Sequence, residues 1–146
     1  MKSLFFEIIC ALLMLLFLYT ALSKSSEFSS FRDTLGRAPL IGKYNFTIAW
    51  ILPAIELMVT VLLFIPRWKM AGIYLSLSLL VLFTGYLAYI VLFRSHHLPC
   101  SCGGVLKKMS WQQHIVFNLL FILLCFAAIK IFKSGGTREG SIAADQ

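Results

Sequence analysis

The amino-acid sequence predicts an all-α protein: an antiparallel four-helix transmembrane bundle with a short interfacial helix between spans 1 and 2. The first observation is composition, because 60% of the 146 residues are hydrophobic, whereas soluble domains are about half apolar. The second is that the apolar residues gather in four runs, each close to the roughly 20 residues that a helix needs to cross a bilayer. The third is that polar residues fill the gaps between the runs. We therefore expect one integral membrane domain over residues 1–146.

The four predicted spans follow from these runs. The first covers residues 4–22, the second 46–66, the third 70–93 and the fourth 113–132. Backbone polar groups in lipid must be hydrogen-bonded within the segment, so each span is expected to be a helix. The remaining residues, 133–146, form a polar tail that we expect to be frayed. Because the number of spans is even, both termini are expected on the same side of the membrane.

The first run raises the alternative of a cleaved secretory signal peptide, because Lys2 precedes it. The run is long for such a peptide, contains Glu7 and lacks a clear A-x-A site before Lys24. We therefore expect this segment to be retained as a membrane-spanning helix.

The segment between the first two spans, residues 23–45, is too long for a plain turn. Phe28, Phe31 and Leu35 recur in it at helical spacing, with Ser, Arg and Asp between them. This pattern is typical of a short amphipathic helix, which we expect to lie on the membrane surface.

The formal net charge of +7 comes from basic residues that sit almost entirely between the apolar runs. Such residues are typical of interfacial anchors and of contacts to anionic lipid head groups. No basic face is interleaved with aromatic residues, so we do not expect nucleic-acid binding.

The positive-inside rule gives no orientation, because six Lys and Arg fall on the terminal side and seven on the other. The first group is Lys2, Arg67, Lys69, Lys130, Lys133 and Arg138, and the second is Lys24, Arg32, Arg37, Lys43, Arg94, Lys107 and Lys108.

The polar gap between the third and fourth spans contains the stretch "RSHHLPCSCGG". Cys100 and Cys102 lie there within reach of water, and the following Lys107, Lys108 and helix N-terminus favour thiolates. A disulfide between positions i and i+2 closes a ring of about eleven atoms, in which the preferred disulfide geometry is hard to reach. Strained bridges of this kind are easily reduced and tend to exchange. The pair therefore indicates thiol–disulfide chemistry.

Two other interpretations of this segment remain open. The thiols could be unpaired and incidental. Alternatively, His96, His97, Cys100 and Cys102 could bind a copper or zinc ion. Structural zinc pairs are usually spaced C-x₂₋₄-C, so C-x-C is tight for one tetrahedral ion.

Polar residues inside the apolar runs are further candidates, because such groups are costly in lipid. Glu56 lies near the middle of the second span, just past Pro53. It could accept a proton or bind a small polar or quinone-like molecule, or it could be a protonated acid that joins two helices through a hydrogen bond. His114 and Asn118 share one face of the fourth span with Cys125. His114 could transfer a proton during thiol exchange, whereas Asn118 could equally belong to a polar seam between helices.

Cys10 and Cys125 lie deep in the first and fourth spans, at similar expected depths. A second redox pair that relays electrons is conceivable. Small apolar filling of the core is the favoured interpretation, because buried free cysteines usually have that role.

These residues resemble the MauE branch of the DoxX-like integral membrane proteins over about residues 4–132. The stretches that carry the resemblance are "PAIEL", "PCSCGG" and "WQQHIVFN". The matching positions are Pro53 and Glu56 for the family's P-x-x-E, Cys100 and Cys102 for its C-x-C, and Trp111 and Asn118 near and within the fourth helix. The chain departs from the usual cysteine–glycine–cysteine–phenylalanine–glycine run, because Ser101 separates the cysteines and no aromatic residue follows.

The resemblance implies a redox-associated protein, linked to thioredoxin-like periplasmic proteins and to the maturation of disulfide-rich partners. It also implies a bacterial inner membrane location, with the cysteine segment in the periplasm and both termini in the cytoplasm. The architecture is similar to four-helix quinone-coupled oxidases of the DsbB and vitamin K epoxide reductase type. Those enzymes normally use a second exposed cysteine pair, which this sequence lacks.

The resulting hypothesis is a membrane thiol–disulfide exchange protein, a candidate oxidoreductase that passes electrons between its C-x-C pair and a periplasmic thioredoxin-like or disulfide-containing partner. Cys100, Cys102 and His114 are the expected catalytic residues, with His97 as another proton handler, and Glu56 and Asn118 are the candidates for holding a small molecule. We assign no resident cofactor and no metal. The alternatives are a non-enzymatic membrane subunit that scaffolds a larger complex and a His/Cys metal-handling protein.

Overall fold

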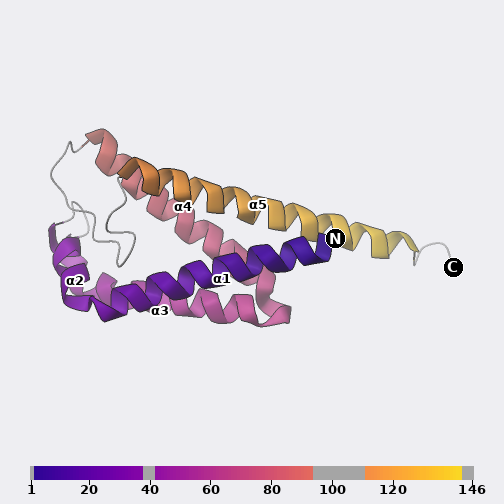
Figure 1. Cartoon of the computed structure of the whole chain (residues 1–146), viewed down its shortest axis with the longest axis horizontal. Coiled ribbons are helices and arrows are strands. Elements are labelled where there is room, and N and C mark those ends of the chain that lie inside the picture. Colours follow the sequence, from indigo (N-terminus) through magenta and orange to yellow (C-terminus); the bar gives the residue numbers. More distant parts are fainter. Residues whose placement is uncertain (1, 38–41, 94–110, 143–146) are drawn as a thin grey trace.

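The protein is all-helical in the computed structural model, which describes residues 2–37, 42–93 and 111–142 (Figure 1). Five α-helices and two short 3₁₀ helices make up these residues. The α-helices are α1 (Lys2–Ser26), α2 (Phe28–Arg37), α3 (Asn45–Phe64), α4 (Lys69–Phe93) and α5 (Trp111–Ile142). The 3₁₀ helices are η1 (Gly42–Tyr44) before α3 and η2 (Pro66–Trp68) between α3 and α4.

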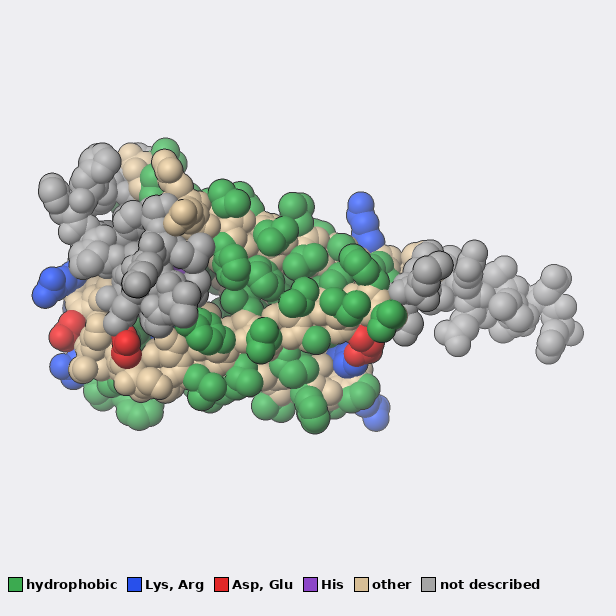
Figure 2. Space-filling view, in the orientation of Figure 1, with side chains coloured by type: hydrophobic (Ala, Val, Ile, Leu, Met, Phe, Trp, Pro, Cys, Tyr) green, Lys and Arg blue, Asp and Glu red, His purple; other side chains and the backbone are tan. Residues whose placement is uncertain are grey.

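The prediction of four apolar spans is confirmed. Four segments are long and apolar enough to cross a membrane: Leu4–Ser26, Gly42–Phe64, Pro66–Tyr89 and Gln112–Ser134. Hydrophobic side chains also cover much of the outer surface along these helices (Figure 2). A surface of this kind is stable against lipid and would be unstable in water. The chain is therefore a multi-pass membrane protein.

Several helix ends differ from the predicted bounds, among them the ends of α3 and α5. The second span was expected to end at Pro66, but α3 ends at Phe64 because Ile65 is extended, with φ −80° and ψ 116°. A residue that precedes proline is pushed out of the helical region by the proline ring, which explains the earlier end. At the C-terminus, α5 continues to Ile142, although the sequence predicted a frayed tail after Phe132. No proline interrupts this stretch, so the helical backbone bonds can continue.

The long helices pack mainly as two pairs, α1 along α3 and α4 along α5 (Figure 1). Further contacts join α3 to α4 and α1 to α5. The largest buried cluster lies between these helices and is almost entirely apolar, with Ile9, Leu13, Val59, Leu63, Ile73, Cys125 and Ala128 nearly or fully inaccessible. This cluster forms the dry core of the bundle.

The segment between α1 and α3 forms a short helix, α2, as the spacing of its apolar residues predicted. Phe31 and Leu35 are buried and pack with Ala49 at the start of α3. The rings of Phe28 and Trp50 lie 5.1 Å apart, inclined by 52°. The apolar stripe of α2 therefore faces the protein, and this contact fixes the entry of the chain into α3.

The buried stripe of α3 carries Glu56 into the bundle. Its members are Ala49, Pro53, Glu56, Val59 and Leu63, at spacings of three and four residues that place them on one helix face. Pro53 lies inside the helix without ending it, which transmembrane helices tolerate because neighbouring groups can compensate for the lost hydrogen bond. Glu56 shares the face of Pro53 and is 6% exposed.

Candidate functional site

A pocket lined by apolar residues and several polar ones lies between the four long helices. Its cavity volume is about 80 Å³, and its walls are mostly leucine and phenylalanine. The polar residues in its lining are Thr20 and Lys24 from α1, Glu56 from α3, and His114 and Asn118 from α5. All of these polar residues except Thr20 are less than 10% exposed. Leu79, Leu80 and Phe83 from α4 also belong to the lining, so all four long helices contribute to one site.

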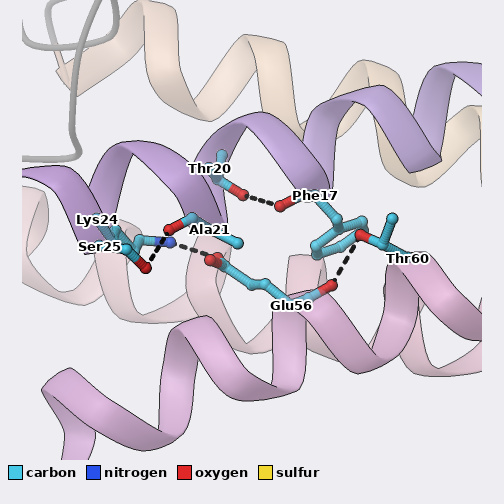
Figure 3. A network of polar contacts seen from close by, with 7 residues as sticks. All are labelled: Phe17, Thr20, Ala21, Lys24, Ser25, Glu56 and Thr60. Atoms are coloured by element: carbon cyan, nitrogen blue, oxygen red, sulfur yellow. Dashed lines mark hydrogen bonds and ion pairs between the residues drawn. The ribbon is translucent and has the colours of Figure 1, made fainter.

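Lys24 and Glu56 form a buried ion pair, in which Lys24 Nζ donates to Glu56 Oε1 (Figure 3). The side chains are 9% and 7% exposed, respectively. The Lys24 ammonium also lies 5.8 Å from the centroid of the Phe31 ring, at the buried face of α2. A charge taken out of water is tolerated only when it is paired in this way. The pair thus fixes α1 against α3 and fixes the position of α2.

Sequence reasoning missed the role of Lys24 and counted it among the cations outside the bilayer. The predicted first span ended at residue 22, whereas α1 continues to Ser26 and carries Lys24 into its last turn. A signal was present, because Cys10, Leu13, Phe17, Ala21 and Lys24 recur at spacings of three and four and all lie on the buried face. Glu56 joins two helices in the structure, but as the partner of a lysine in an ion pair and not as the protonated acid considered from the sequence.

Nearby hydroxyl groups bond to the backbone of their own helices. Thr20 Oγ1 donates to Phe17 O at 3.1 Å, Ser25 Oγ donates to Ala21 O at 2.8 Å, and Thr60 Oγ1 donates to Glu56 O at 3.0 Å (Figure 3). Hydroxyls that bond back to the preceding turn are common in helices. Glu56 Oε2 has no hydrogen-bond partner within the described part of the chain. This oxygen can therefore still accept a hydrogen bond from a group bound in the pocket.

His114 lies in the first turn of α5 and is 4% exposed. Its ring meets the Phe83 ring edge-on, with centroids 5.4 Å apart. Asn118 follows one turn later and is also 4% exposed. Neither His114 Nδ1 nor Asn118 Nδ2 has a hydrogen-bond partner among residues 2–37, 42–93 and 111–142. The prediction that these residues share one helix face is confirmed, and that face is turned into the pocket.

Three buried polar atoms without a described partner thus belong to residues, on two helices, that line one small cavity. A buried donor or acceptor left without a hydrogen bond costs about 1–3 kcal/mol. Native proteins keep few such groups, and those they keep usually bind a water molecule or an ion, or have a role in function. The arrangement provides a donor at Asn118, an acceptor at Glu56 and an imidazole nitrogen that can do either, depending on its tautomer.

The cysteine segment lies outside the described residues, and so do His96 and His97. The structure therefore leaves Cys100 and Cys102 as predictions. Among the residues that are described, no group of three His, Cys, Asp or Glu side chains could hold a metal ion. Cys10 and Cys125 are free, 2% and 0% exposed, and belong to the dry core. Neither of them lines the pocket, which favours their interpretation as core residues.

Comparison with known proteins identifies the family. The model of the family described as "Methylamine utilisation protein MauE" matches residues 2–131, most of the chain. The chain belongs to the MauE family. No curated protein and no solved structure matches it. The matched range of this MauE-family protein contains both the pocket and the C-x-C segment, whereas the wider likeness to DoxX-like proteins stays a resemblance.

Proposed function

We propose that this MauE-family protein exchanges thiols and disulfides at the membrane surface through Cys100 and Cys102. The observation that carries the proposal is the setting of His114. It is buried in the first turn of α5, which follows the cysteine segment in the described part of the chain, and its Nδ1 has no partner in the described residues. A histidine in such a place can accept and return the proton of a thiol. The family assignment and the C-x-C spacing of Cys100 and Cys102 in the sequence support the same chemistry.

In the proposed topology, α1, α3, α4 and α5 cross the bacterial inner membrane as an antiparallel bundle. The end of α4 and the start of α5 lie at the same end of the molecule as α2 (Figure 1). This end would face the periplasm, with α2 at the membrane interface, and both termini would be cytoplasmic. A periplasmic thioredoxin-like or disulfide-containing protein would then reach the cysteines from water.

The exchange proceeds in two displacements that conserve electrons. One cysteine, as a thiolate after losing its proton to His114 or His97, attacks a sulfur of the partner's disulfide. A mixed disulfide forms, the partner's S–S bond breaks, and the leaving thiolate takes up a proton. The second cysteine then attacks the mixed disulfide, so that the chain becomes oxidised and the partner becomes a dithiol. The reverse sequence oxidises the partner by the same steps.

The test uses purified protein in lipid nanodiscs, with thioredoxin as the probe. We expect the protein and thioredoxin to exchange thiols and disulfide, with the equilibrium toward reduced protein and oxidised thioredoxin, because a strained disulfide is the stronger oxidant. Cys100→Ser together with Cys102→Ser should abolish this exchange while leaving insertion unchanged. Of the two single variants, one should accumulate a mixed disulfide with the probe, because the resolving thiol is missing. That variant identifies the attacking cysteine.

The matched control removes the other two cysteines. Cys10→Ala with Cys125→Ala changes the same number of thiols inside the dry core and should leave the exchange rate within about twofold, since neither residue lines the pocket. Full exchange in the double serine variant would disprove the proposal. Loss of exchange in the alanine control, with the fold retained, would instead favour an electron relay through the buried pair.

A further inference from the structure

The pocket between the four helices has more hydrogen-bonding capacity than the described residues use. Glu56 Oε2, His114 Nδ1 and Asn118 Nδ2 are all buried, and all belong to residues of its lining. Three buried polar groups without hydrogen bonds would together cost a large fraction of the stability of a domain. A bound group that both donates and accepts hydrogen bonds would remove this cost.

The volume of the cavity decides what that group is. A cavity of about 150 Å³ is the size that admits a benzene ring, whereas one water molecule takes about 30 Å³ in the liquid. The cavity here is about 80 Å³. It is therefore about half the size of the cavity that admits a benzene ring. It has room for two or three water molecules, which can each donate and accept.

The charges around the cavity define what such water would do. The titratable side chains in its lining are Lys24, Glu56 and His114, and the remaining polar members are Thr20 and Asn118. The ion pair uses one oxygen of Glu56 and leaves the other free to accept from water. Water between this oxygen and His114 Nδ1 would connect two groups that can each bind a proton.

We propose that the pocket holds two or three ordered water molecules, and that these link His114 and Asn118 to the Lys24–Glu56 pair as a proton-exchange site inside the bundle. Asn118 anchors the water by donating from Nδ2, and Glu56 accepts from it. The site would store the proton that His114 receives from a thiol, and this role rests on the proposed thiol exchange. The hydration itself does not depend on the cysteines.

The experiment measures water access to the His114 ring by hydrogen–deuterium exchange. The hydrogen on Cε1, between the two ring nitrogens, exchanges slowly with D₂O, and only where water reaches the ring. The protein is incubated in D₂O in nanodiscs and digested, and the deuterium in the peptide that contains His114 is determined by mass spectrometry. We expect exchange within about tenfold of a free histidine peptide, in spite of the 4% exposure of this side chain.

Two variants alter the pocket and one serves as a control. Asn118→Leu removes the anchoring donor at similar volume, and Leu79→Phe fills the cavity from α4, so each should slow the exchange at His114 at least tenfold. Ser76→Ala removes another fully buried polar side chain, whose Oγ donates to Gly72 O at 2.7 Å outside the pocket. This control should leave the rate unchanged, and it corrects for any general loosening of the bundle.

The outcomes separate the two proposals. Undetectable exchange at His114 in the unaltered protein would show a dry pocket and overturn the inference. If the exchange rate at His114 in both pocket variants equalled that of the unaltered protein, water would reach the ring by another route, which would also overturn the inference. The measurement is repeated in the Cys100→Ser, Cys102→Ser variant, where the same rate is expected. If the proposed thiol exchange proves wrong, the hydration of the pocket can therefore still be judged from this measurement.

Discussion

Two ion pairs connect helices at opposite ends of α1, and their surroundings differ. Lys69 Nζ donates to both oxygens of Glu7, at 2.7 and 2.5 Å, and the Glu7 side chain is 52% exposed. Lys24 donates to one oxygen of Glu56, and both side chains are less than 10% exposed. The outer pair uses its whole carboxylate to join α1 to α4. The inner pair leaves an oxygen unused where the pocket begins.

This difference indicates that the inner pair does more than join helices. Burying two charges costs several kcal/mol per ion before their attraction offsets it, and apolar side chains of similar size often stabilise a protein as well or better. A tether between α1 and α3 could therefore be built from leucine and methionine. The charges instead place a proton-binding group and a positive charge in the lining of the pocket that His114 also lines, which a purely structural contact would not require.

The largest effect is expected from breaking the inner pair. Glu56→Gln keeps the size of the side chain but leaves the Lys24 ammonium buried without its counter-charge. Removing one partner of a buried ion pair costs about 3–5 kcal/mol. The free energy of unfolding, measured by titration with sodium dodecyl sulfate in mixed micelles, should fall by this amount.

The reciprocal and double variants show whether charge burial is the cause. Lys24→Met should be destabilising to a similar extent, whereas Lys24→Met combined with Glu56→Leu should recover most of the lost stability. Such a recovery would still leave the hydration of His114 impaired, because the accepting oxygen is gone. Additive losses in the double variant would instead mean that packing, and not charge, determines the stability of this end.

A smaller loss is expected in the dry core, where α3 and α4 approach closely. A methyl group at Gly72 would come within 2.9 Å of Leu63 Cδ2 and Cγ, and 3.1 Å from the Leu63 backbone nitrogen. Leu63 is itself fully buried, so it has little room to move. Gly72→Ala should therefore lower the free energy of unfolding by about 1–3 kcal/mol, as overpacking usually does.

The matched variant for this prediction is Gly85→Ala, on the same helix. A Cβ at Gly85 meets no atom within 4 Å among those described, so alanine should be neutral or slightly stabilising there. Both variants should leave water access to His114 unchanged, since neither glycine lines the pocket. Equal effects at the two glycines would show that helix propensity, and not the close contact with Leu63, governs Gly72.

The sequence predicted the spans well because a bilayer imposes one simple requirement on them, a long apolar run. It also singled out Glu56, His114 and Asn118, since a polar residue within such a run is costly enough to be conspicuous. The structure brings all three to one pocket. The arrangement of α2 was half predicted: its apolar spacing indicated a helix, but could not tell whether the stripe would face lipid or α3.

Lys24 could not be assigned by composition alone. It lies two residues past the predicted end of its span, among serines, and there a lysine normally extends into the interface. Its burial depends on a carboxylate that is 32 positions away in sequence, on another helix. Tertiary pairing of this kind leaves no mark on hydropathy. Only the register of Lys24 with the buried face of α1 could have indicated it.

The smallest effect is expected from the outer pair, although the chemical change is the same as in the inner pair. Glu7→Gln removes one carboxylate charge, as Glu56→Gln does, but at a half-exposed site. Exposed ion pairs contribute about 0–1 kcal/mol and are screened by salt. Unfolding titrations should therefore show a loss below about 1 kcal/mol, and the loss should shrink further when salt is raised. The Glu56→Gln deficit should persist in the same salt, because water and ions reach that pair poorly. Salt-independent losses of equal size at both positions would contradict the distinction drawn between the two ends of α1.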